Sequence, residues 1–260
     1  MEKECVNLLS PDTNNGSRAR GPGVRVFYEK RGGACFVPHV ALATLFARAA
    51  NRAGIGLQMT EGFSPHAKMS FGPELPAGVV ALSEPLDIWI EGDARAAENA
   101  PDRLAERWNE QMPEGFRVVK CLFPAEGAAA LGKDCKAALY WVWAAGADAG
   151  ELESSLNRHY GENLLQSLAA GTCCKDEDEN KNENGRGFSR VSFVVSKPAQ
   201  NGIGGWVKAL TAEGTIAGWQ DLRIVRAALG RWNGAQLEPL AEEGIVCLRI
   251  KTQTESRTEK

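Results

Sequence analysis

The architecture of this chain is set by two consecutive stretches, Val24-Arg-Val-Phe-Tyr-Glu-Lys30 and, after a glycine pair, Pro38-His-Val-Ala-Leu-Ala-Thr-Leu-Phe-Ala-Arg-Ala-Ala-Asn-Arg-Ala-Gly54. In the first, Val24, Val26 and Tyr28 alternate with other residues at the period of two that is typical of a strand. In the second, apolar residues recur three and four positions apart, which places them on one face of a helix. Proline suits the first helical turn and glycine the end, so the pair predicts a strand followed by an amphipathic helix.

Downstream, the pattern continues with extended segments, a second amphipathic helix and a closing strand. The extended segments are expected at 57–61 with 69–71 and at 86–90, the helix at 94–111, and the last strand at 116–123. The resulting order β-α-β-β-α-β is that of a ferredoxin-like, or split βαβ, unit, which we assign to residues 23–125.

Residues 135–251 mix strand and helix patterns in a less regular order, which predicts a second, degenerate α+β unit. The predicted fold class is therefore α+β. Two polar segments interrupt this organisation, residues 1–22 and residues 171–187. Because they carry too few apolar side chains to offset the entropy lost on ordering, we expect a disordered leader and a disordered insertion.

The composition is that of a globular protein, with 260 residues, 43% hydrophobic residues and a formal net charge of −3. These values exclude a uniformly basic nucleic-acid coat, a collagen-like chain and a wholly disordered one. No run approaches the roughly 20 apolar residues of a membrane span, and no secretory signal opens the chain. The seven scattered cysteines fit no disulfide framework, so a cytoplasmic protein with reduced thiols and without membrane contact is expected.

Charge is distributed unevenly along the chain. Between residues 24 and 72, six basic side chains accompany two acidic ones, a local net charge of +4. A basic face on an acidic protein is a possible phosphate-backbone footprint. The alternative is a solvated helix face with incidental loop charges. The basic residues are Arg25, Lys30, Arg31, Arg48, Arg52 and Lys68.

The segment 61–78, rich in glycine and proline, carries the densest chemical signal. Ser64, His66 and Lys68 supply donors suited to an anion, and Phe63 and Phe71 supply rings on which a base could stack. A stiff, polar loop with aromatic residues is a candidate binding site. The alternative is a structural hairpin whose phenyl rings pack into the core.

His39 has two readings. At the start of the predicted helix, a charged imidazole is disfavoured, which indicates a neutral, hydrogen-bonded residue at the core edge. Alternatively, His39 and His66 converge at one end of the sheet near Glu61 and Glu74. A transition-metal site needs a third clear ligand, so no metal site is predicted. An acid–base role for His66 beside Lys68 is chemically possible.

Several of these motifs resemble the radical-SAM-linked family, a domain of unknown function. The resemblance rests on the Gly-Phe-Ser-Pro-His-Ala-Lys run at 62–68, the Leu-Pro-Ala-Gly-Val run at 75–79 and the opening stretches quoted above, and it covers residues 24–92. This chain departs from the family pattern at Pro38, Ala41, Ser64 and Ala67, where the family has Ser, Asp, Asn and Pro. A family role that requires the carboxylate is therefore not carried over to Ala41.

The resemblance implies a partner, or a fused C-terminal extension, of cobalamin-type radical SAM proteins. The chain lacks a three-cysteine iron–sulfur motif, so it is not itself the radical enzyme and no cofactor is expected. The first hypothesis is a non-catalytic or accessory module that binds RNA or a ribonucleoprotein for a radical SAM modifying partner. Its nucleic-acid-binding residues would be Arg25, Lys30, Arg48, Arg52, Phe63, Ser64, His66 and Lys68, with His39 as a further possible site residue.

Two alternatives remain at this point. One is an RNA-processing or RNA-modifying enzyme in which His66 moves protons and Lys68 stabilises charge on phosphate. The other is a protein-binding scaffold that docks the radical SAM partner through apolar surface.

Overall fold

The computed structural model describes residues 23–93, 95–96, 99–125, 127–170 and 188–241. Within them the chain forms a nine-stranded, mostly antiparallel sheet with five α-helices, which agrees with the α+β class predicted from the sequence. The predictions of disorder at 1–22 and 171–187, and the end of the second predicted unit beyond residue 241, lie outside the described residues. No helix in the described ranges is long and apolar enough to cross a membrane.

The first half follows the expected order of elements. It contains β1 (Val24–Lys30), α1 (His39–Arg52), β2 (Met69–Phe71), β3 (Val80–Ile88), α2 (Pro101–Asn109) and β4 (Phe116–Leu122). The strands lie in the order β4-β1-β3, β2 pairs with β3, and all these pairings are antiparallel. The helices cover the core through Phe46 of α1 and Trp108 of α2, both fully buried, whose ring centroids lie 5.8 Å apart.

Two sequence predictions in this half are corrected, and the strand expected at 86–90 begins earlier, as β3 spans Val80–Ile88. Residues 57–61 form no continuous strand, because only isolated bridges join Leu57 to Ile90 and Met59 to Ala67. The start of this segment pairs with the residues just after β3, and its end pairs with the chain that comes back after the turn at Gly62. The helix predicted at 94–111 begins at Pro101, since proline fits the first turn but would remove a hydrogen bond from a helix interior.

The second half contains α3 (Leu131–Asp134), β5 (Ala137–Ala145), α4 (Ala149–Tyr160), β6 (Leu164–Ala170), β7 (Phe188–Ser196), α5 (Ile203–Ala212), β8 (Leu222–Trp232) and β9 (Leu237–Pro239). The strand order continues as β8-β5-β7-β6, with antiparallel pairing. A separate apolar core forms here around Trp206 of α5 and Phe193 of β7, whose ring centroids lie 5.3 Å apart.

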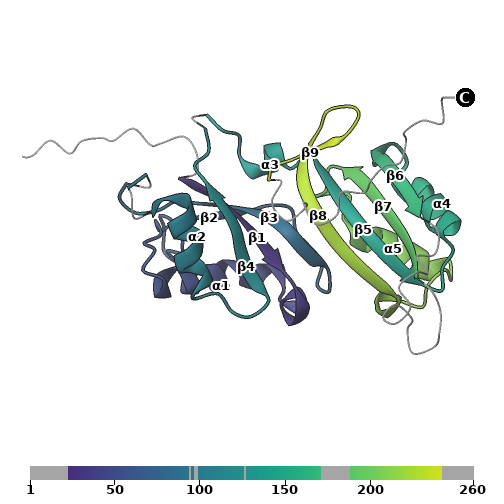
Figure 1. The fold of residues 1–260 in the computed structure, drawn as a ribbon, viewed down its shortest axis with the longest axis horizontal. Coiled ribbons are helices and arrows are strands. Elements are labelled where there is room, and N and C mark those ends of the chain that lie inside the picture. The colour runs from purple at the N-terminus through teal and green to yellow at the C-terminus, as the bar shows by residue number, and fades with distance from the viewer. Residues whose placement is uncertain (1–22, 94, 97–98, 126, 171–187, 242–260) are drawn as a thin grey trace, which may run out of the picture.

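The two halves meet where β3 and β8 lie side by side in the middle of the molecule (Figure 1). This is the parallel pairing of the sheet, and it joins Val80 to Val225 and Ala81 to Arg226. Arg226 is almost completely buried there and donates from Nε to Glu84 at 2.7 Å. Its Nη atoms also donate to the carbonyls of Pro73 and Glu74, which ties the segment before β3 to the second half.

Candidate functional site

The segment from Gln58 to Lys68, here called the hairpin, is the most prominent outward feature of the first half. The Thr60 N–H donates to the His66 carbonyl at 2.8 Å, and the Lys68 N–H donates to the Gln58 carbonyl at 2.7 Å. Gly62 at the tip has φ of 133°, a conformation that favours glycine. The predicted loop is therefore a hydrogen-bonded hairpin with a defined tip.

His66 is held on one limb of the hairpin and exposed to solvent. Its backbone N–H donates to the Thr60 hydroxyl at 3.1 Å, and its Nδ1 lies 3.1 Å from the same hydroxyl and 3.3 Å from the Ser64 carbonyl. These contacts fix the ring and leave Nε2 without a hydrogen bond to any described residue. A ring fixed in this way can meet a ligand through its free nitrogen.

Phe63 and Lys68 present the other binding groups of the hairpin. The Phe63 side chain at the tip is fully exposed, with a relative accessibility of 112%. Lys68 is also exposed, and its ammonium lies 4.6 Å from the centroid of the Trp89 ring, a cation–π contact that orients the side chain. Ser64 is exposed between them. The hairpin thus exposes an apolar ring at its tip and a cation at its base.

Arg48 and Arg52 lie on the exposed face of α1. The Arg52 Nη2 atom donates to the Gln111 carbonyl at 3.0 Å, which anchors one of these two cations. Arg48 lies between two hollows. One, of about 440 Å³, reaches Met59 and Ala67 of the hairpin, and the other, of about 460 Å³, reaches Arg52. Arg48 therefore borders both a hollow that the hairpin lines and a hollow that Arg52 lines.

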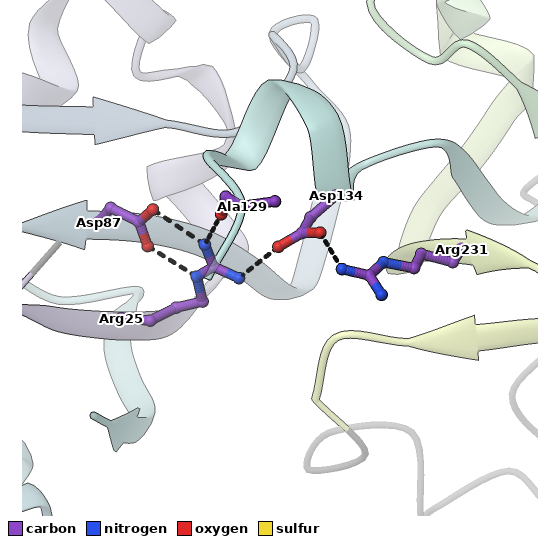
Figure 2. Close-up of polar contacts among 5 residues, drawn as sticks. All are labelled: Arg25, Asp87, Ala129, Asp134 and Arg231. Atoms are coloured by element: carbon purple, nitrogen blue, oxygen red, sulfur yellow. Dashed lines mark hydrogen bonds and ion pairs between the residues drawn. The ribbon is translucent and has the colours of Figure 1, made fainter. Parts of the chain in front are cut away.

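Arg25 and Lys30 are both buried, so the structure does not support their predicted place in a phosphate-binding face. The Arg25 guanidinium donates to Asp87 at 2.7 and 3.0 Å, to Asp134 at 2.9 Å and to the Ala129 carbonyl at 2.9 Å, as Figure 2 shows. Burial lowers the pKa of Arg25, but the hydrogen bonds of the two carboxylates outweigh it and the net pKa is raised. These groups satisfy the cation internally.

Lys30 is 2% exposed, and among the described residues its ammonium donates to the Val37 carbonyl alone, at 3.4 Å. Burial is the main cause that lowers its pKa, while the nearby Cys35 and Glu84 act in the opposite direction. An amine removed from solvent in this way cannot reach a nucleic-acid backbone at the surface. We therefore leave Arg25 and Lys30 out of the site.

His39 and Phe71 lie away from the hairpin tip. Their rings contact each other at 5.6 Å, and Phe71 also packs against Phe46 at 5.9 Å. Burial lowers the pKa of His39, partly offset by Glu74. Within the described residues, His39 and His66 share no hydrogen bond or ring contact. Phe71 is thus a packing residue, whereas its counterpart Phe63 faces solvent.

Sequence reasoning missed Asn51, Met59 and Glu91, which line the hollow beside the hairpin. No periodicity marks these three residues, because they come from α1, the hairpin and the segment that follows β3. Within the described residues, no group of three His, Cys, Asp or Glu side chains is placed to hold a metal ion.

Comparisons with known proteins place the chain in a family but do not assign an activity. No curated protein matches it. A crystal structure of an unknown protein from Galdieria sulphuraria covers 77% of this chain and 94% of its own, at 9% identity and a TM-score of 0.23, a likeness too weak to support an argument. A family model described as an uncharacterized protein conserved in bacteria (DUF2344) matches residues 24–173, more than half of the chain, and the chain belongs to that family.

Proposed function

We propose that this protein binds single-stranded RNA, free or within a ribonucleoprotein, through the hairpin and the outer face of α1. The observation that carries the proposal is the fully exposed Phe63 ring at the tip of a hydrogen-bonded hairpin, beside His66 and Lys68. Apolar rings are normally buried, and a base stacked on an aromatic side chain contributes roughly 1–3 kcal/mol. A rigid hairpin offers that ring without a large ordering cost.

The cations nearby supply the second part of such an interface. Arg48 and Arg52 from α1 and Lys68 from the hairpin are all exposed. Single-stranded nucleic acids are bound by surfaces that combine a cationic track for the backbone with aromatic platforms for the bases. Ser64 and the free His66 nitrogen add donors suited to a phosphate or a sugar hydroxyl.

A radical SAM protein is proposed as the partner that would modify the bound RNA. This part rests on the resemblance of the Gly62–Lys68 run to the radical-SAM-linked family. Phe36, just before α1, and Val40, in its first turn, are 72% and 85% exposed and favour a docking surface for such a protein. The same two residues support the second candidate function, a protein-binding scaffold without RNA.

The first half is further proposed to be a ferredoxin-like unit. Its support is the order β-α-β-β-α-β and a sheet in which β3 lies between β1 and β2 with antiparallel pairings. An enzymatic role is not proposed, because His66 has no second titratable side chain at hydrogen-bond distance in the described residues.

The test is fluorescence anisotropy with a labelled single-stranded RNA of mixed sequence. Phe63→Ala and Lys68→Ala should each weaken binding about tenfold, in line with the loss of one stacked base or one charged contact. The matched controls Trp219→Ala and Lys208→Ala alter an exposed aromatic residue and an exposed lysine of the second half, and they should leave the affinity unchanged. Equal affinities for all five proteins, or no binding by wild type, would reject RNA binding at this surface.

A further inference from the structure

We infer that the hollow between α1 and the hairpin is a guanine-selective pocket, an inference that rests on the proposed RNA-binding function. The hollow has a volume of about 440 Å³, within the range of small-ligand sites. Its floor is apolar, formed by the buried Ile55 and Leu57. Met59, half exposed, forms one wall, and a thioether is a favourable neighbour for a flat aromatic ring.

Three polar side chains surround this apolar floor: Arg48, Asn51 and Glu91. Neither the Asn51 amide nor the Glu91 carboxylate makes a hydrogen bond or ion pair with another described residue. An apolar base with a few convergent polar groups is typical of a ligand site. The Asn51 amide and the Glu91 carboxylate are therefore available to a ligand.

The Glu91 side chain lies directly against Gly56. The Glu91 N–H donates to the Gly56 carbonyl at 2.9 Å, which fixes the backbone of the two segments. A Cβ on Gly56 would lie 2.9 Å from Glu91 Oε2, closer than real Cβ atoms come to a neighbour. The carboxylate thus rests against the bare glycine Cα at the border of the hollow.

A carboxylate selects among bases by the pattern of donors on their edges. Guanine presents two adjacent donors, N1–H and the N2 amino group, that match the two oxygens of one carboxylate. Adenine and cytosine present one amino group next to an acceptor, and uracil presents a single N–H between two carbonyls. Glu91 therefore favours guanine, and Asn51 can donate to the guanine O6.

The charges nearby fit a nucleotide within a strand better than a free base. Arg48 borders both this hollow and the neighbouring one, so it can bind the phosphate that links a base in one to the next nucleotide in the other. Lys68 and the Phe63 tip lie on the same hairpin as Met59 and Ala67. A guanine in the hollow would thus belong to the same RNA strand that the hairpin binds.

The test compares oligouridylates that carry one central guanine, inosine or adenine, by anisotropy against the all-uridine strand. Wild type should prefer the guanine strand about tenfold, and inosine, which lacks the N2 amino group, should lose most of that gain. Glu91→Gln should abolish the preference. Gly56→Ala, which changes no charge, should weaken the preference to a smaller degree, because only the flexible end of the Glu91 side chain has to move aside, and both variants should retain the all-uridine affinity. Glu151→Gln, an exposed glutamate on α4, is the matched control.

The outcomes separate the two proposals. If no strand binds wild type, the proposed function fails. If all strands bind equally and Glu91→Gln changes nothing, RNA binding stands and the guanine pocket is rejected. Circular dichroism of Gly56→Ala distinguishes a local displacement from misfolding, and loss of the preference in Glu91→Gln alone suffices to support the pocket.

Discussion

Arg25 and Asp87 form a two-pronged, buried ion pair between the neighbouring strands β1 and β3. Nε and Nη2 of the arginine donate to the two carboxylate oxygens at 2.7 and 3.0 Å, and neither side chain is more than 7% exposed. Asp134 of α3 accepts from the same guanidinium with one oxygen and from Arg231 of β8 with the other (Figure 2). A chain of charges therefore runs from the first half through α3 to the second.

Removal of one charged partner from this buried network should lower the stability of the protein. Asp87→Asn removes one of the two carboxylates that pair with the buried Arg25 and leaves only Asp134, so we expect a loss of about 3 kcal/mol in the free energy of unfolding, measured by urea titration. Glu213→Gln, which breaks the exposed pair with Arg158, is the control and should change stability little. Similar effects of the two variants would contradict a structural role for the buried network.

Lys30 offers the opposite case, a buried cation without an ion pair in the described residues. Because burial opposes its charge, Lys30→Met should leave the free energy of unfolding unchanged or raise it. RNA affinity should stay at the wild-type value, since the amine does not reach the surface. Weaker RNA binding by a stably folded Lys30→Met protein would return this residue to the interface predicted from the sequence.

His39 should make stability depend on pH. Burial lowers its folded-state pKa below the ordinary 6.5, and the charged groups that face it are Glu74, Glu84, Lys30 and Arg226. The unfolded chain therefore binds the proton first. The stability from neutral His39 is present above pH 6.5 and is lost as the pH falls through the lower folded-state value.

Urea titrations between pH 7.5 and about 5 test this sign, since they span the ordinary histidine pKa. His39→Gln should flatten the decline in the free energy of unfolding over that interval. His159, whose pKa is also lowered by burial, contributes a further part, so the double variant should be flatter still. A steeper decline in His39→Gln would mean that folding favours the charged imidazole.

Local patterns in the sequence predicted the parts of the fold that depend on near neighbours. The strand β1 was predicted from the alternation of Val24, Val26 and Tyr28, and the helix α1 from the helical spacing around Phe46. Both patterns depend only on residues a few positions apart in the sequence. The burial of Arg25 was not predictable in this way, because its partner Asp134 lies 109 positions away. A basic residue on a strand looks the same in sequence whether it meets solvent or a distant carboxylate.

The candidate site, too, could be predicted from the sequence only in part. Its turn-rich composition identified the hairpin, and Lys68 and His66 are exposed as the RNA-binding hypothesis requires. The sequence could not tell which phenyl ring faces solvent, since Phe63 and Phe71 differ only in what folds against them. Phe71 packs against the buried ring of Phe46, whereas the hydrogen bonds of the hairpin hold Phe63 away from the core.

The salt dependence of RNA binding provides a last test of the cationic surface. Each phosphate contact releases bound counterions, so the logarithm of the association constant falls with the logarithm of salt concentration by about 0.7 per contact on a single strand. Arg48→Ala and Lys68→Ala should each reduce that slope by roughly 0.7, while Lys208→Ala on α5 should leave it unchanged. Phe63→Ala should lower the affinity at every salt concentration with the slope intact, because stacking releases no counterions. A slope that falls equally in Phe63→Ala and Lys68→Ala would show that the hairpin acts as one structural unit, without separate stacking and phosphate contacts.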